Sequence, residues 1–179
     1  MDPLDVHFKH PTTIQVFKPT RYNKTRLVRR ILEEQLIQPF ATRIIWVYSN
    51  LQLDNDFIRK RYHGKDFENR WRNDIFDSLN LEQGNIPVLD DQMGVASSST
   101  SVADLFTKKS HYRNLTVIYL LQNVYNQGKS QRTISLNSHN SVVFRNAWDA
   151  SQVRIMAYQK CTNYGKWLVD SFPDATSKP

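Results

Sequence analysis

A lysine and a threonine, Lys24 and Thr25, stand side by side where a loop gives way to a helical pattern. The apolar run Thr13–Phe17 precedes this loop and has the length of a short buried strand. The apolar residues after the loop recur at helical spacing, at Leu27, Val28, Ile31, Leu32 and Leu36. Because a helix N-terminus attracts anions, an ammonium and a hydroxyl placed there can bind a phosphate and its metal ion.

This loop matches the phosphate-binding pattern G-x-x-x-x-G-K-[ST] only in part. Lys24 and Thr25 fill the last two positions, whereas Lys18 and Asn23 stand where the pattern has glycine. Lys18, Thr20, Asn23, Lys24 and Thr25 are therefore the expected contacts of a nucleotide phosphate. Taken alone, the pair is explained better by an ordinary Lys-Thr in the first turn of a helix than by a phosphate site.

Polar side chains also follow two other apolar strand patterns. Asp90 and Asp91 come after Asn85–Leu89, and Gln122 comes after Leu115–Leu121. Ligands of open parallel sheets bind beyond the carboxyl ends of the strands. There, Asp90 can support Mg²⁺, Asp91 can activate a water molecule, and the Gln122 amide can sense a phosphate or align that water. Polar turns that end buried strands are the alternative explanation for all three.

A short basic cluster lies between the last two of these strand patterns, at Lys108, Lys109, His111 and Arg113. It suits either a phosphate-reaching arginine or a nucleic-acid patch. A solvated face is the alternative, as for most short charge runs. The net charge of +7 and the pI near 9.6 favour an acidic partner, most commonly nucleic acid.

The length of 179 residues, 40% of them apolar, fits a polar lead-in over residues 1–12 and one domain over residues 13–179. The N-terminus does not resemble a signal peptide, and no apolar run is long enough to span a membrane. We therefore expect a protein that is not secreted and does not engage a membrane, and that is cytoplasmic, nuclear or virion-associated.

Strand and helix patterns alternate along the chain, which predicts an α/β fold with a mostly parallel sheet flanked by helices. The pattern adds a strand at Arg43–Ser49, a helix near Ala150–Tyr158 and short strands at Val142–Phe144 and Lys166–Val169. Since the chain stops soon after the last of these, we expect a sheet that lacks a final element at the C-terminus.

Four segments, taken in order, resemble the DNA-packaging ATPase of Maverick/Polinton elements and related DNA viruses, in the FtsK/HerA branch of P-loop NTPases. The segments are Asn85–Met93, Asp104–Leu115, Val117–Asn123 and Arg132–Ser138. The resemblance runs from about residue 10 to residue 176. It implies the P-loop NTPase three-layer sandwich and an ATP-driven, Mg²⁺-dependent motor. Such a motor pumps double-stranded DNA into a capsid as a homo-oligomeric ring.

The resemblance also implies a role for each matching position. Lys24 and Thr25 match the phosphate-loop lysine and hydroxyl. Asp90 matches the Mg²⁺-linked acid, and Asp91 matches the acid beside it. Gln122 matches the sensor residue, and Arg113 is the candidate for a trans-acting arginine.

The departures from the family fall on the phosphate loop, where Lys18, Arg21 and Asn23 replace three glycines. Glycine there permits positive φ and close approach of the backbone to phosphate. A left-handed non-glycine residue costs roughly 1–2 kcal/mol, and Asn tolerates it best. Together the replacements remove roughly 3–5 kcal/mol of binding, on the order of a thousandfold. We therefore expect ATP binding and hydrolysis to be weakened or lost, although the added charge of Lys18 and Arg21 offers another way to hold phosphate.

Two alternatives stand beside the impaired ATPase. One is a non-catalytic DNA-binding or assembly module, derived from a transposable element or virus, that keeps the α/β scaffold. The other is a small-molecule or nucleotide kinase. The sequence lacks the clear Arg-rich lid that would favour a kinase.

Overall fold

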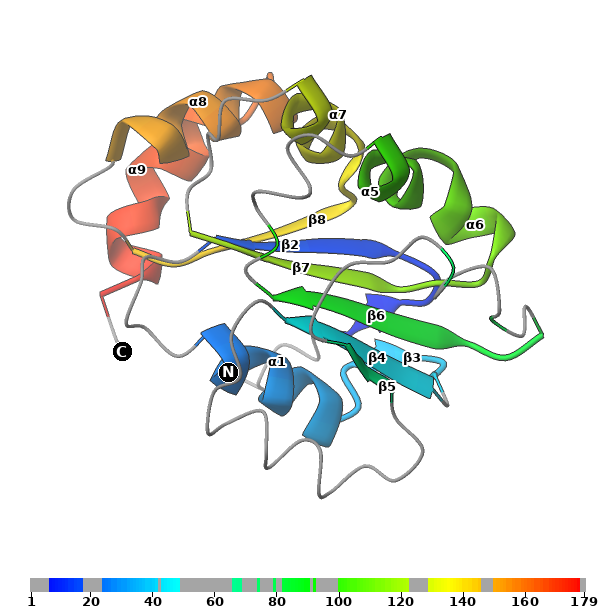
Figure 1. The fold of residues 1–179 in the computed structure, drawn as a ribbon. Helices are drawn as coiled ribbons and strands as arrows, with labels where there is room; N and C mark the ends of the chain where they lie inside the picture. The colour runs from blue at the N-terminus through cyan, green and yellow to red at the C-terminus, as the bar shows by residue number, and fades with distance from the viewer. Residues whose placement is uncertain are drawn as a thin grey trace.

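The computed structural model describes residues 7–17, 24–41, 43–48, 66–68, 74, 79, 82–90, 92, 100–122, 129–145 and 150–177. Its centre is a sheet in which every neighbouring pair of strands is parallel (Figure 1). The strand order is β5 (Asp66–Glu68), β4 (Arg43–Tyr48), β6 (Asn85–Asp90), β7 (Val117–Leu121), β2 (Thr13–Phe17) and β8 (Asn140–Val143).

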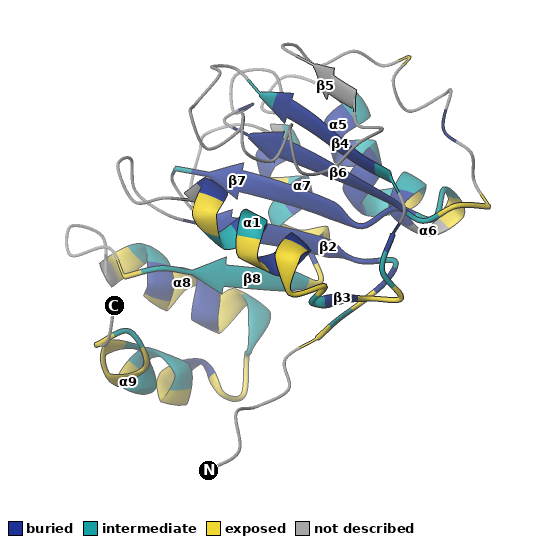
Figure 2. Cartoon of the chain, turned by 90° about the horizontal axis from the view of Figure 1, so that it is seen from below, coloured by how far each residue is buried: buried dark blue, intermediate teal, exposed yellow. Residues whose placement is uncertain are grey.

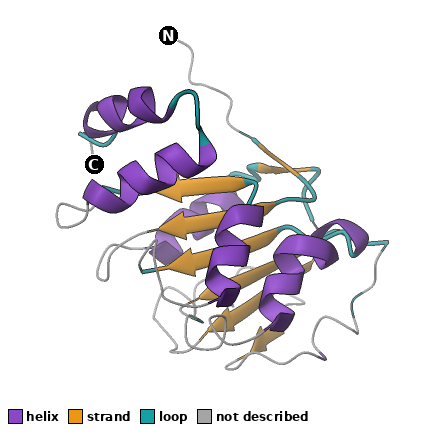
Figure 3. Ribbon diagram, turned by 90° about the horizontal axis from the view of Figure 1, so that it is seen from above, coloured by secondary structure: helices purple, strands orange, loops and turns teal. Residues whose placement is uncertain are grey.

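Helices cover both faces of this sheet, so the fold is the three-layer sandwich expected from the sequence (Figures 1 and 3). The chain passes from β2 out to β4 and then returns through β6 and β7 to β8. Because parallel crossovers share one hand, the outward and the returning helices lie on opposite faces. One face carries α1 (Lys24–Glu33); the other carries α5 (Thr100–Asp104), η1 (Leu105–Lys109), α6 (Ser110–Tyr112), α7 (Lys129–Asn137) and α8 (Ala150–Lys160).

Two apolar cores fill the spaces between the layers. Ile14 and Val16 of β2 pack against α1, whereas Phe17 packs on the other face with Phe106 of η1 and Ile134 of α7. Every residue of β2 is buried, and Figure 2 shows the buried strands behind α1. The continuous apolar character of these strands follows from burial on both faces, as parallel sheets require.

The residues before β2 take part in the fold as well. Strand β1 (Phe8–Lys9) pairs in parallel with β3 (Ile37–Gln38), which follows the end of α1. Gln35 takes a positive φ of 51° at that helix end, so that the chain turns back toward β1. No helix in the described part of the chain is both long and apolar enough to cross a membrane.

A polar network ties the amino end of β2 to its neighbours. Thr12 N–H donates to the Thr116 hydroxyl (3.3 Å), which lies 2.6 Å from His10 Nδ1, while His10 Nε2 lies 2.9 Å from Asn114 Oδ1. These contacts fit a neutral imidazole protonated at Nε2, since the Asn114 oxygen can only accept. On the β8 side, Thr13 N–H donates to His139 Nδ1 at 3.2 Å.

The sequence-based elements are largely confirmed, with one clear error. The predicted strand Lys166–Val169 is wrong, because this segment lies inside α9 (Gly165–Ala175). Leu168 and Phe172, four residues apart, are half-buried, and a Cβ on Gly165 would lie 2.8 Å from Tyr158 Cδ1. The segment therefore forms a helix because α9 packs closely on α8, a contact that the local sequence pattern does not show.

Burial lowers the pKa of His10 below its ordinary 6.5, and the hydrogen bond to Asn114 opposes this effect. The unfolded chain then binds a proton more readily, so the free energy of unfolding should be highest above pH 6.5 and fall as the pH drops below it. Urea denaturation from pH 8 to pH 5 measures this slope. His10→Asn should flatten it; an unchanged slope in His10→Asn would refute the assignment.

Gln15 is fully buried in the middle of β2, and neither amide atom has a hydrogen-bond partner within the described structure. Unpaired buried polar groups cost about 1–3 kcal/mol. Gln15→Met keeps the length of the side chain and removes the polar atoms, so it should raise the free energy of unfolding by about 1 kcal/mol or more. Thr13→Val, on the same face of β2, removes a hydroxyl that accepts from His139 N–H at 2.9 Å and should lower stability. Destabilisation by Gln15→Met would instead indicate bound water.

Candidate nucleotide site

The candidate site lies at the carboxyl edge of the sheet. Tyr48 of β4, Asp90 of β6, Leu120 of β7, Val16 of β2 and Val142 of β8 form one row across five strands. The acid at the end of β6 and the end of β2 therefore stand at the same level of the sheet. Two strand spacings separate them, which is roughly 10 Å.

Thr25 reaches this edge through α1. The helix begins at Lys24, after the loop that follows β2, and Thr25 in its first turn is only 3% exposed. Val28 and Leu32, three and seven residues further along, share its helix face and pack into the core under α1. The amphipathic pattern of the helix thus turns the Thr25 hydroxyl toward the sheet.

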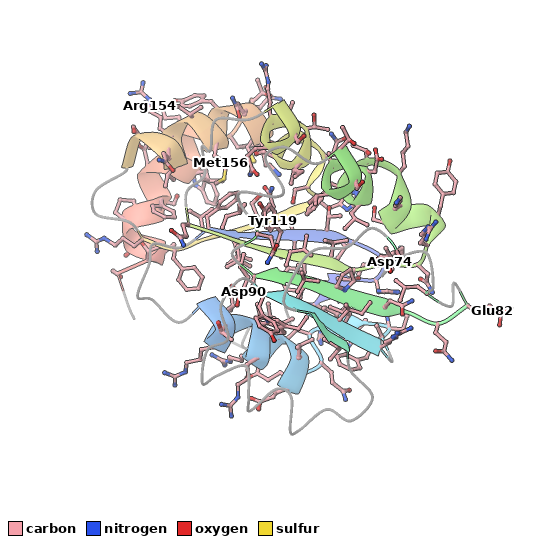
Figure 4. The ribbon with its side chains drawn as sticks, in the orientation of Figure 1. Asp74, Glu82, Asp90, Tyr119, Arg154 and Met156 are labelled. Atoms are coloured by element: carbon pink, nitrogen blue, oxygen red, sulfur yellow. The ribbon has the colours of Figure 1, made fainter. Side chains whose placement is uncertain are left out.

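Asp90 faces the same layer. Ile86 and Val88 of β6 belong to the core under α1, and side chains two residues apart point to the same face of a strand. Asp90 therefore continues the row toward α1, and it is only 4% exposed. Figure 4 shows Asp90 at the end of β6 that lies nearest to α1.

Gln122 follows β7 directly and is half-buried. Since β7 lies between β2 and β6, the structure brings Gln122 to the same edge as Thr25 and Asp90. Two further polar residues at this edge escaped the sequence reasoning. Tyr48 pairs in register with Asp90, and Gln92, two residues beyond it, is 3% exposed. In the sequence Tyr48 is visible only as the end of an apolar strand pattern, and Gln92 has no local signal; their place beside Asp90 follows from the strand pairing.

Several predicted contacts lie outside the described residues. These are the loop positions Lys18, Thr20 and Asn23, together with Arg21 and the second acid, Asp91. Lys24 is described as the first residue of α1, without its side chain. The roles expected for these residues stay predictions.

Arg113 lies at the opposite end of the strands from Asp90, at their amino ends. It precedes β7, and its neighbour Asn114 accepts from the backbone N–H of Asn85 at the start of β6. Asp90 lies five positions after Asn85 in β6, which is a distance of roughly 17 Å along the strand. The structure therefore does not bring Arg113 together with Asp90 within one chain, and the expected role in trans stays a prediction.

The described part of the site suits a metal-bound phosphate. A hydroxyl and a carboxylate are the hard oxygen donors that Mg²⁺ prefers, and both are buried on one face at the strand ends. A helix N-terminus adds a favourable potential for an anion. Thr25 and Asp90 are therefore the residues that would hold Mg²⁺, either directly or through water.

Comparison with known proteins gives matches in structure alone. No protein-family model and no curated protein matches the sequence. The genome-packaging NTPase B204 of Sulfolobus turreted icosahedral virus 2, solved with ATPγS and with AMPPCP, superposes with a TM-score of 0.56 in each case. Identity is 12% and 11%, and the matches cover 88% and 87% of this chain and 86% and 87% of that chain.

The Thermomonospora curvata EccC structure (ATPases 2 and 3), in complex with a signal sequence peptide, gives a TM-score of 0.54 at 14% identity over 79% of this chain. The match spans 31% of the EccC chain, about a third. The chain therefore shares the α/β fold of these solved NTPase and ATPase structures. At these identities the likeness establishes the architecture, and the chemistry has to be argued from the site itself.

Proposed function

We propose that this protein is a relative of the ATP-driven motors that package or translocate double-stranded DNA, with ATP binding and hydrolysis weakened or lost. The observation that carries the proposal is the burial of Thr25 and Asp90 on one face, at the carboxyl edge of a P-loop ATPase fold. The fold of the viral packaging NTPase supports the motor class, and the sequence resemblance supports the Maverick/Polinton type.

In a competent site the residues divide the work as follows. Lys24 and the first turn of α1 would hold the phosphates, and the Thr25 hydroxyl and Asp90 would hold Mg²⁺, whose charge would offset that of the phosphates. Asp91 accepts a proton from the attacking water, and Gln122 aligns that water. Arg113 of a neighbouring subunit in a ring is the candidate for stabilising the transition state. The missing glycines act before any of these steps, because they limit how closely the loop backbone approaches phosphate.

A non-catalytic DNA-binding or assembly module, derived from a transposable element or virus, is the second candidate. The three glycine replacements in the loop favour it, because a binding module has no need of the phosphate cradle. Both the impaired motor and the non-catalytic module would have capsid proteins and further copies of this chain, arranged in a ring, as partners.

Restoring the glycines tests the impairment. The triple variant Lys18→Gly, Arg21→Gly, Asn23→Gly should bind ATP with Mg²⁺ roughly a thousandfold more tightly than the natural chain, because the strain of three non-glycine residues is removed. Isothermal titration calorimetry measures both affinities, and adding Lys24→Ala to the variant is the control that should abolish binding. Equal affinity of the natural chain would show that its loop is competent. Failure of a folded glycine variant to bind would count against an ATPase ancestry of the site.

Thr25 is tested in the same glycine-restored background. Thr25→Val keeps the buried shape and removes the hydroxyl, so Mg²⁺ should no longer strengthen ATP binding, whereas Thr25→Ser should keep most of the effect. The measurement is ATP affinity with Mg²⁺ and with EDTA. Similar Mg²⁺ dependence in the Val and Ser variants would remove Thr25 from the metal site.

A further inference from the structure

Positive charge is concentrated on one layer of the protein. The segments 100–113, 129–137 and 150–160 form the helical layer opposite α1, and they contain seven Lys and Arg residues against one acid, Asp104. The basic residues are Lys108, Lys109, Arg113, Lys129, Arg132, Arg154 and Lys160. The helix α9 that follows has one basic residue and two acids, so the excess belongs to this layer.

Three of these charges stand on the outer side of the layer. Lys108, Arg132 and Arg154 are exposed, each on a different helix, and no ion pair involves them in the described part of the chain. Figure 4 shows Arg154 pointing away from the sheet, whereas Met156 on the same helix points toward it. Lys160 is not part of this surface, because its Nζ turns inward and donates to the carbonyl of Ser138 at 2.8 Å.

The helix α1 on the other face is basic as well, but two of its arginines are compensated. Arg29 pairs with Glu33 at 3.0 Å, and Arg30 pairs with Glu34 at 2.6 Å. Of the α1 side chains that the structure describes, Arg26 is exposed and belongs to neither pair. The two faces therefore differ in how many exposed basic side chains stand outside these ion pairs, with three on the layer opposite α1 and one on α1.

The helices of this layer lie side by side across the sheet (Figures 1 and 3). The continuous helical segment α5–η1–α6 comes first, α7 lies next to it, and α8 follows. Exposed side chains that can lie against sugar or base edges stand among the charges. Tyr112, 83% exposed, follows Lys108 by one turn, and Leu136 follows Arg132 by one turn. A helical surface with exposed basic residues on three helices and a single acid in the layer is complementary to a regular polyanion.

We propose that the outer surface formed by Lys108, Arg132 and Arg154 binds the phosphate backbone of double-stranded DNA. The choice of duplex DNA rests on the proposed function, whereas the surface itself is independent of nucleotide binding. It lies over the second face of the sheet, away from the site between α1 and the strand ends, so DNA and nucleotide occupy different parts of the chain.

The test compares two variants of equal net charge. The face variant carries Lys108→Gln, Arg132→Gln and Arg154→Gln; the control carries Lys9→Gln, Arg30→Gln and Lys166→Gln, three exposed residues elsewhere. Each variant lowers the net charge by three, so a difference between them reports position. Thermal unfolding checks that both remain folded. Binding of a fluorescent 30-base-pair duplex is followed by anisotropy over a series of NaCl concentrations.

For the face variant, the slope of log K against log salt should become shallower by about 0.9 for each lost phosphate contact, hence by roughly 2 to 3 in total. The control should keep the slope of the natural chain. Equal losses in both variants, or none in the face variant, would overturn the proposal. So would loss of binding to phosphatidylserine vesicles by the face variant with duplex binding intact.

Nucleotide affinity, measured in the glycine-restored background with and without the face substitutions, separates this proposal from the motor proposal. Selective loss of DNA binding with unchanged nucleotide affinity supports the surface. Selective loss of DNA binding in a chain that binds no nucleotide also supports it, and would leave the non-catalytic module as the function.

Discussion

The pairing of β2 between β7 and β8 is the constraint on which the other features depend. Its residues are buried on both faces, so its backbone groups must be satisfied by the two neighbouring strands. That pairing aligns the end of β2 with Asp90 and with Leu121, the residue before Gln122. The polar network around His10, Thr116 and His139 secures the opposite end of the strand, where the chain enters the sheet.

The two faces of the sheet carry different tasks, and the alternation of side chains along each strand separates them. In β6, Ile86, Val88 and Asp90 point toward α1, while Leu89 points into the other core. The same rule puts Thr13, Gln15 and Phe17 on the side of α7. The candidate nucleotide site therefore lies on the α1 side of the sheet, and the exposed basic residues Lys108, Arg132 and Arg154 belong to the layer opposite.

The non-glycine residues in the loop before α1 and the integrity of the scaffold are physically compatible. Glycine in such a loop serves the approach of backbone to ligand, whereas the cores depend on Ile14, Val16, Trp46 and their neighbours. The residues at positions 18, 21 and 23 are therefore compatible with two filled cores. The proposed loss of ATP binding requires no loss of the fold.

The sequence by itself determined the α/β class, the five main parallel strands and the helix that carries Lys24 and Thr25, because apolar periodicity is a local property of the chain. It also marked Asp90 and Gln122 as candidate site residues, a role that stays a prediction, since polar residues that end buried strands are visible without coordinates. The tertiary structure decided what depends on long-range pairing: the place of β7 between β2 and β6, the separation of Arg113 from Asp90, and the proximity of Tyr48 to that acid. It also decided the helix at Gly165–Ala175, because contact with α8 outweighs the local preference of a short apolar run.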